Sequence, residues 1–127
     1  MNRNNLSMQI YMSCFDHNEY NEKIGAFCEK SCITDAVRKK IELAFEELVC
    51  NNIAVFIEHN DDRGLPISVM IEHYGVDDAT EMTITYGGDR YDPVYEGDEL
   101  SSVIAKKIFG SVKYRYDDGN VLVVVIE

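Results

Sequence analysis

The chain has 127 residues, of which 46% are hydrophobic and 10% aromatic; these proportions indicate one globular domain with a core and exclude a disordered chain. Its 23 acidic and 12 basic residues give a formal net charge of −11, which argues against binding to nucleic acid phosphates. The N-terminal residues contain no long apolar stretch, so we expect no signal peptide, no membrane span and a cytoplasmic location. Neither a repeat nor a linker divides residues 1–127, which we predict to form a single domain.

The first half of the chain predicts one strand followed by two helices. The expected elements are a strand at 8–13, a helix at 16–32 and a helix at 34–59. Asp16 is suited to cap the first helix, and Thr34 or Asp35 the second. Apolar residues at helical spacing predict the buried stripe of the long second helix, which consists of Val37, Ile41, Ala44, Leu48 and Val55.

The second half predicts four strands and one helix. In chain order these are strands at 67–75 and 81–87, an acidic and aromatic loop at 88–98, a helix at 99–110, and strands at 111–117 and 120–127. Asp118 and Gly119 form the turn between the last two strands. This order predicts an α+β two-layer sandwich, in which a mixed, mostly antiparallel sheet carries three helices on one face.

The four cysteines do not form a metal-binding pattern. Cys28 and Cys32 lie four residues apart on one face of a predicted helix, but no CxxC pair occurs and no second pair of ligands accompanies them. We therefore expect no zinc site and predict reduced, largely buried thiols.

Two polar residues of the long helix are candidates for a functional site. Glu47 and Asn51 are spaced i, i+4 and are therefore neighbours on the helix surface. At about 100° per residue, Asn51 points within roughly 40° of the apolar stripe, so its amide needs a partner. That partner is backbone, water, or a bound metal and ligand; a bond to a neighbouring strand would make Asn51 a core amide. Glu47 lies at the edge of the stripe, where its carboxylate either faces a pocket or is a solvated surface group.

The stretch "LAFEELVCNN" around these residues resembles the N-box of GHKL-type ATPases, a group that includes histidine kinases and gyrase. The likeness covers nearly the whole chain and is strongest to small bacterial anti-sigma factors with serine kinase activity. It implies the GHKL ATPase fold, Mg-ATP as cofactor and a homodimer. It gives Asn51 the role of binding Mg²⁺ and bridging to the phosphates, since Mg²⁺ prefers oxygen ligands. It gives Glu47 the role of catalytic base.

The stretch "YGGDRYDP", which begins at Tyr86, resembles the adenine-binding loop of the same family, Asp-x-Gly-x-x-Phe-Asp-Pro. Gly88, Asp92 and Pro93 match, and Tyr91 stands in the phenylalanine position. The resemblance therefore implies that Tyr86, Gly88 and Asp92 contact the nucleotide. However, Tyr86 replaces the aspartate that accepts a hydrogen bond from the adenine amino group. Its ring would fill part of the purine pocket unless it swings out.

The third family motif is absent. Before their third helix, family members have Gly-x-Gly-Leu, which lets backbone N–H groups approach the phosphates. This chain has acidic and hydroxyl side chains there instead: Asp98, Glu99, Ser101 and Ser102. The two carboxylates suit a helix N-terminus but would repel a triphosphate. An ordinary acid-capped helix is therefore favoured over a phosphate site.

The catalytic-helix motif is kept while both nucleotide motifs are altered. We therefore predict an anti-sigma-factor-like regulator whose Mg-ATP binding is weak or lost, and whose partner is a sigma factor or an anti-anti-sigma-type protein. If the site is active, the reaction is Mg-ATP-dependent serine/threonine protein phosphorylation. One alternative is a nucleotide-independent protein-binding module on the same fold. The other is an unrelated α+β domain in which the N-box arose by chance.

Overall fold

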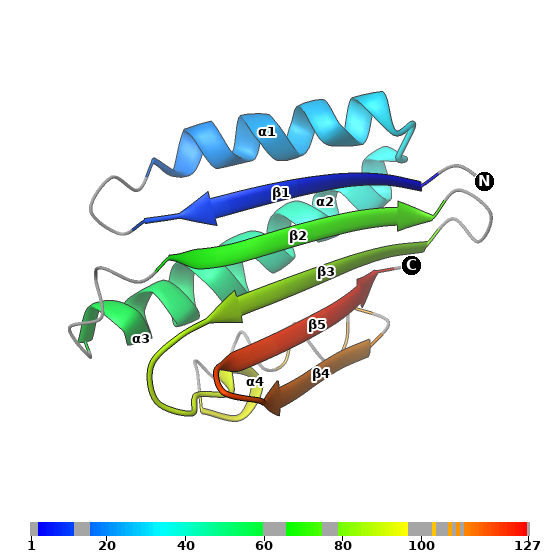
Figure 1. Cartoon of the computed structure of the whole chain (residues 1–127). Helices are drawn as coiled ribbons and strands as arrows, with labels where there is room; N and C mark the ends of the chain where they lie inside the picture. Colours follow the sequence, from blue (N-terminus) through cyan, green and yellow to red (C-terminus); the bar gives the residue numbers. More distant parts are fainter. Residues whose placement is uncertain are drawn as a thin grey trace.

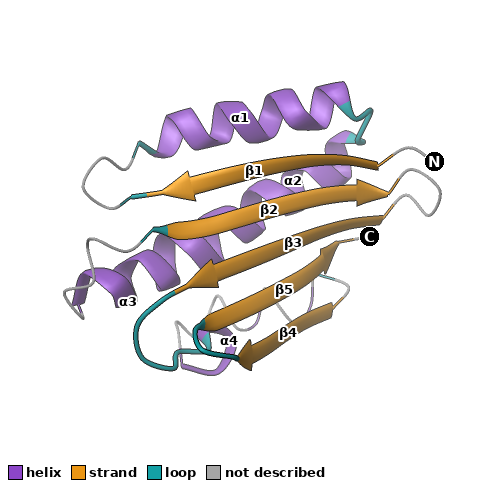
Figure 2. Ribbon diagram, in the orientation of Figure 1, coloured by secondary structure: helices purple, strands orange, loops and turns teal. Residues whose placement is uncertain are grey.

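The computed structural model describes residues 3–11, 16–59, 66–74, 79–96, 103, 107, 109 and 111–126. Its centre is a five-stranded sheet in the order β1-β2-β3-β5-β4, and every pairing in it is antiparallel. The strands are β1 (Arg3–Ile10), β2 (Ile67–Tyr74), β3 (Ala79–Tyr86), β4 (Ser111–Tyr116) and β5 (Asn120–Ile126). Helix α1 (His17–Lys30) and a longer helical run cover one face of this sheet (Figures 1 and 2). The predicted α+β class is confirmed, but the described sheet is antiparallel throughout and not mixed as predicted.

The longer helical run crosses behind the sheet and has three parts: α2 (Asp35–Ala44), the π-helical segment η2 (Phe45–Ile53) and α3 (Ala54–His59). The predicted helix at 34–59 is thus confirmed, but its π-helical centre was not expected. Fully buried side chains repeat along it every four residues: Ile41, Phe45, Val49, Ile53 and Ile57. In an α-helix, four residues overshoot one turn by about 40°, so this stripe would wind around the helix. A π-helix turns less per residue, which keeps the stripe facing the sheet.

The helices begin at polar caps, as their sequences predict. The Asp16 carboxylate accepts hydrogen bonds from the backbone N–H groups of Asn18 and Glu19, at 3.1 and 3.5 Å. Thr34 caps α2, because its Oγ1 accepts from the N–H of Val37 at 3.3 Å. Of the two caps considered for the long helix, Thr34 is therefore the one used.

The core lies between the sheet and the helices. Strands β2, β3 and β5 bury alternate side chains, as expected for a sheet covered on one face. The first strand was predicted at 8–13. The observed strand β1 begins earlier, at Arg3, and ends at Ile10. Its early part contains two asparagines, which are poor strand formers, although Leu6, Met8 and Ile10 share its inward side.

Two further differences concern the region after β3. A short helix, α4 (Pro93–Glu96), lies within the segment that was predicted as a loop. The predicted helix at 99–110 lies outside the described residues apart from three positions, and so do Asp98, Glu99, Ser101 and Ser102. Among the helices that the structure describes, none combines the length and hydropathy needed to cross a lipid bilayer.

Candidate functional site

The long helical run places Asn51 differently from the prediction. Glu47 and Asn51 both lie in η2, but Glu47 is partly buried while Asn51 is exposed. Val55, expected on the buried stripe, is 42% exposed. The predicted core-side orientation of Asn51 and Val55 is therefore wrong. The prediction assumed α-helical rotation throughout, whereas the π-helical segment turns later positions by a smaller total angle.

The adjacent residue, Asn52, is the amide that faces inward. Its side chain is 4% exposed, and its Nδ2 donates to the backbone carbonyl oxygen of Glu47 at 2.5 Å. The two residues are five positions apart, the same spacing that π-helical backbone hydrogen bonds join. Asn52 therefore supports the π-helical turn and is a core amide bonded within its own helix. For Asn51 the sequence left open a core amide bonded to a neighbouring strand; the core amide is instead Asn52, and its partner lies in its own helix.

Tyr86 ends β3 and lies inside the molecule. Its side chain is 3% exposed, and its hydroxyl donates to the carbonyl oxygen of Tyr91 at 2.6 Å. Burial raises the pKa of Tyr86 above its ordinary value, and the nearby Tyr114 and Asp92 add to this effect. The hydroxyl therefore stays protonated and remains a donor. The ring does not swing out; it fastens the following loop to the end of the sheet.

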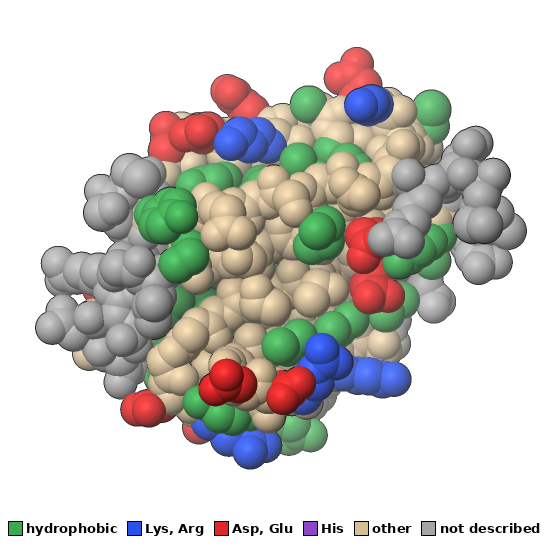
Figure 3. Space-filling view, viewed as in Figure 1, with side chains coloured by type: hydrophobic (Ala, Val, Ile, Leu, Met, Phe, Trp, Pro, Cys, Tyr) green, Lys and Arg blue, Asp and Glu red, His purple; other side chains and the backbone are tan. Residues whose placement is uncertain are grey.

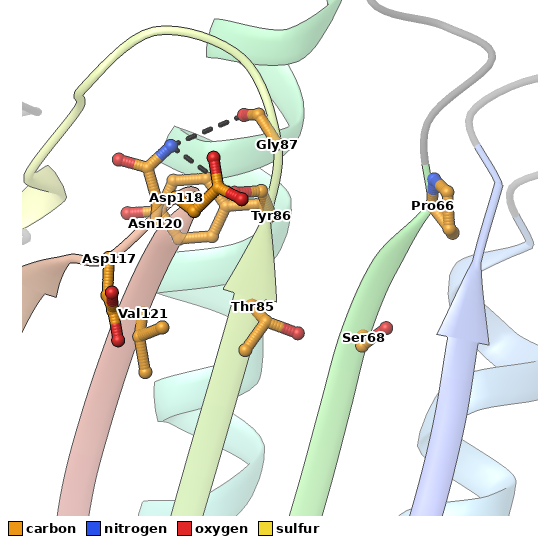
Figure 4. A pocket seen from close by; sticks show the side chains of 10 residues that line it. Pro66, Ser68, Thr85, Tyr86, Gly87, Asp117, Asp118, Asn120 and Val121 are labelled. Atoms are coloured by element: carbon orange, nitrogen blue, oxygen red, sulfur yellow. Dashed lines mark hydrogen bonds between the residues drawn. The ribbon is translucent and has the colours of Figure 1, made fainter.

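Asn120, the first residue of β5, clamps the same loop from the neighbouring strand. Its side chain is 1% exposed. Its Oδ1 accepts from the N–H of Tyr91 at 2.9 Å and from the Tyr114 hydroxyl at 2.5 Å. Its Nδ2 points to three carbonyl oxygens within 3.3 Å, those of Tyr86, Gly87 and Asp89; the contacts to Tyr86 and Gly87 are drawn in Figure 4. One amide thus satisfies backbone groups along the whole turn.

The loop is also held against the helices. The ring of Tyr91 stacks on Phe56 of α3, with centroids 4.2 Å apart and planes 8° from parallel. Such a pair contributes about 0.5–1.5 kcal/mol beyond its buried area. The segment after β3 is therefore joined to the sheet by Asn120 and to the helical layer by Phe56.

Gly88 and Asp92 have local structural roles in this loop. Gly88 has a φ of 86°, in the region that favours glycine. The Asp92 carboxylate accepts from the N–H of Val94 at 3.0 Å, and the Glu96 carboxylate accepts from the N–H of Asp92 at 2.7 Å. Asp92 therefore caps α4. A turn and a helix cap therefore account for Gly88 and Asp92, two of the three residues that match the family's loop.

Asp92 gives a pH-dependent prediction. Burial raises the pKa of its carboxyl above the ordinary value, and the hydrogen bond from Val94 offsets this only partly. Because the folded-state pKa lies above the unfolded-state pKa, the stability that Asp92 contributes falls as the pH rises through the folded-state value. Asparagine keeps a capping oxygen without the charge. We expect Asp92→Asn to melt above the wild type at pH 7, and this gap to narrow as the pH falls toward about 4.

Scanning calorimetry between pH 7 and about pH 4 measures the difference in melting temperature between Asp92→Asn and the wild type. The matched control is Asp117→Asn, which changes an exposed aspartate and should give a difference that is small at every pH. A gap for Asp92→Asn that does not change with pH would show that burial of the charge is not its cause.

The predicted site residues lie in two parts of the molecule, the segment η2 and the end of β3 with the loop that follows it. The structure brings Tyr86, Gly88 and Asp92 together in one loop, but Asn51 faces outward from the helix. The Tyr86 hydroxyl is bonded to the loop, and the Asp92 carboxylate caps a helix. In the described part of the chain, no cluster of three His, Cys, Asp or Glu side chains could hold a metal ion.

A hollow of about 360 Å³ lies at the same end of the sheet, beside the turn between β4 and β5 (Figure 4). Its volume is within the range of small-molecule sites. Its lining includes Ser68, Thr85, Tyr86, Val121, Asp117 and Asp118, and none of Glu47, Asn51, Gly88 or Asp92. The two aspartates at the turn would repel a phosphate group. The hollow is therefore not a substitute for the nucleotide site.

The cysteines are free thiols where the structure describes them; Cys14 lies outside that part. Cys28 is buried, and burial raises its pKa to about 11. Burial, followed by the charge of Glu46, raises the pKa of Cys50 to about 12. The prediction of buried thiols is confirmed for Cys28 and is wrong for Cys32, which is exposed. Cys32 follows the end of α1, beyond the helical face on which it was placed.

Sequence reasoning missed Asn120, Phe56 and Tyr114 as the residues that organise the loop. For Asn120 a signal was present. It has the same strand parity as Leu122, Val124 and Ile126, which all point into the core. A single amide on the buried side of an otherwise apolar strand needs partners there. Phe56 carried no such signal, because the π-helical segment sets its direction.

No protein-family model and no curated protein matches this chain. The starting points for a functional proposal are therefore the residues described above, the order of the elements and the resemblance of the motifs.

Proposed function

We propose that this chain is an anti-sigma-factor-like regulatory domain of the GHKL type that binds a protein partner and does not depend on ATP. The observation that carries the proposal is the hydrogen bond from the buried Tyr86 hydroxyl to the Tyr91 carbonyl oxygen, at 2.6 Å. In the resembling ATPases, the residue at the position of Tyr86 reads the adenine amino group. On this proposal, the buried Tyr86 ring would fill part of the purine pocket, and its hydroxyl is already bonded within the loop.

The arrangement of the elements supports the fold that the resemblance implies. One strand, two helical elements and two strands come first, and a final pair of strands closes an antiparallel sheet whose helices share one face. Glu47 and Asn51 lie on the helical run behind this sheet, and Tyr86 ends one of its strands. These are the elements on which the family carries its N-box and its adenine-binding loop.

The contacts of the loop support independence from ATP. A nucleotide at the proposed position would have to displace the Tyr86–Tyr91 hydrogen bond, the Asn120–Tyr91 hydrogen bond and the Tyr91–Phe56 stack. At roughly 1 kcal/mol each, these contacts would reduce the affinity for a nucleotide by more than about a hundredfold. The exposed Asn51 offers no compensating ligand on the inner side of the helix.

A thermal-shift measurement with Mg-ATP tests the proposal. A ligand present at about 100 times its Kd stabilises the folded state by about 2.7 kcal/mol, which is readily detected as a rise in melting temperature. We expect no rise at millimolar Mg-ATP, because a bound purine would have to break the contacts that hold the loop. Mg²⁺ alone and the wild type without nucleotide provide the baselines.

The opposite result would be equally informative. A clear rise with Mg-ATP that disappears in Asn51→Ala would overturn the proposal. It would restore the Mg-ATP-dependent serine/threonine kinase, with Glu47 as its catalytic base. Asn52→Ala is unsuitable for this comparison, because Asn52 supports the helix itself.

A further inference from the structure

The face of the sheet that none of the described helices covers, called the uncovered face below, has one strand of unusual composition, β5. Helices cover one face, so alternate side chains of each strand point away from them, and in an antiparallel sheet that side is ordinarily polar. On β1 it carries Asn5, Ser7 and Gln9, in agreement with this rule. On β5 it carries Val121, Val123 and Val125, while the alternate residues of β5 are buried in the core. A strand that is apolar on both sides is typical of one that is covered on both sides.

Basic side chains border this valine strip, which we define as Val121, Val123 and Val125, on the β4 side. The register places Lys113 opposite Val123 and Arg115 opposite Val121, so both side chains share the uncovered face. Both are exposed, and among the described residues neither makes an ion pair. Figure 3 shows Lys or Arg atoms over β4 beside a line of hydrophobic atoms over β5. The net charge of the whole chain is −11, so the positive charge of Lys113 and Arg115 is a local exception.

The two ends of the strip are acidic. Glu81 lies opposite Val125, and Glu72 lies opposite Glu81 on the next strand. At the other end, Asp117 and Asp118 form the turn that precedes β5 and line the hollow described above. The strip is therefore short, with positive charge along one side and negative charge at each end.

We propose that the valine strip receives an amphipathic helix of a protein partner, whose apolar stripe is bordered on one side by Asp or Glu. This inference rests on the proposed role as a protein-binding module and names the surface and the partner's chemistry. A sheet face offers side chains and no free backbone groups, so an added strand would gain no ladder hydrogen bonds there, whereas a helix can lay its stripe on it. Acidic residues on the β4 side of the helix would meet Lys113 and Arg115.

The dimensions of the strip set the length of the helix. Val121 and Val125 are four residues apart, or about 13 Å along a strand, which corresponds to about nine residues of α-helix. Acids beyond that length would approach the carboxylates at either end and be repelled. An anionic membrane is disfavoured for the same reason, since the acidic ends and the net charge of −11 oppose it.

Synthetic peptides test this proposal. The probe is a side-chain-stapled helix of about twelve residues with leucines on one stripe and glutamates along one edge of it. The matched peptide has lysines in place of those glutamates. We expect the glutamate peptide to shift the NMR amide signals of β4 and β5, and to bind at least tenfold more tightly than the lysine peptide at low salt. In Lys113→Glu/Arg115→Glu the preference should reverse.

Two variants separate binding from folding. Val123→Thr keeps a β-branched side chain of similar shape on a partly exposed position, so it should weaken the peptide at least fivefold while leaving the melting temperature unchanged. Lys30→Glu/Lys39→Glu makes the same change of charge on exposed helical positions and should leave the peptide preference as in the wild type.

Several results would overturn the proposal. These are equal affinity for the two peptides, signal shifts that avoid β4 and β5, binding to anionic vesicles that Val123→Thr abolishes, or self-association that the same variant abolishes. The outcome is independent of the nucleotide experiment. An ATP-induced thermal shift would overturn the proposed function without affecting the peptide data, and failure of the peptides would leave the ATP result standing.

Discussion

Replacing Asn120 with alanine is expected to lower the free energy of unfolding by about 3 kcal/mol, because it leaves buried backbone groups without partners. The lost amide serves three carbonyl oxygens, the N–H of Tyr91 and the Tyr114 hydroxyl, all around a site that is 1% exposed. Urea denaturation measures the loss. Amide hydrogen exchange should show that Tyr91 loses protection well before the core strands do, because the loop is released first.

The matched control is Asn51→Ala, the same substitution at an exposed position of the helical run. We expect it to change stability by no more than about 0.5 kcal/mol, and alanine is the better helix former. If the two variants were equally stable, the Asn120 network would not be what holds the loop. Asn120→Asp provides a second measurement: it keeps the acceptor oxygens but places a charge beside three carbonyl oxygens, and should also destabilise.

Replacing Tyr86 with aspartate is expected to lower the free energy of unfolding by about 5 kcal/mol, the largest effect considered for this chain. The change restores the acid that the resembling family uses to read adenine, but it removes a large buried ring and buries a carboxylate in its place. The new carboxyl would lie near Asp92 and Glu96, whose charges already raise the pKa of Tyr86. We therefore expect no gain of ATP binding without other changes.

The direction of the pH dependence identifies the cause. Burial and the nearby acids should raise the folded-state pKa of the new carboxyl above its unfolded value of about 3.9, so stability is lost as the pH rises through the folded-state pKa. Tyr86→Asp should therefore be less destabilised at pH 5 than at pH 7.5 in urea titrations. Tyr86→Phe keeps the ring and loses only the hydrogen bond to Tyr91, so it should cost about 1 kcal/mol at both pH values. Equal losses for the aspartate variant at the two pH values would contradict this account.

Most strands of the sheet were predictable from the sequence, because the alternation of apolar and polar residues is a local signal. Strands β2, β4 and β5 begin where their patterns predict, and the Asp16 and Thr34 caps are read from single side chains. The start of β1 was missed because Asn4 and Asn5 are poor strand formers. The prediction also missed α4, whose single turn is held by two hydrogen bonds, from the N–H of Val94 to the Asp92 carboxylate and from the N–H of Asp92 to the Glu96 carboxylate.

The candidate site was harder to predict, and the reason is specific. The direction of Asn51 depended on the rotation per residue along 25 helical positions, and the π-helical segment changed that rotation in the middle of the run. Tyr86 was predicted within a strand at 81–87 and is the last residue of β3, where it shares the strand parity of the buried Met82 and Ile84. The amide that holds its backbone carbonyl comes from Asn120, 34 positions later. Long-range contacts of this kind leave no pattern in the local sequence.

The π-helical segment also bears on how the gene can change. Ile41 and Ile57 both face the core although they lie sixteen positions apart, which is about 4.4 turns of α-helix, whereas fifteen positions make about 4.2. An α-helix would therefore need one residue fewer between Ile41 and Ile57 to turn nearly the same side toward the core, and the gene one codon fewer. Loss of a codon within Phe45–Ile53 can be absorbed by a return to α-helical geometry. The same loss in α1 would rotate every later position of that helix by about 100°.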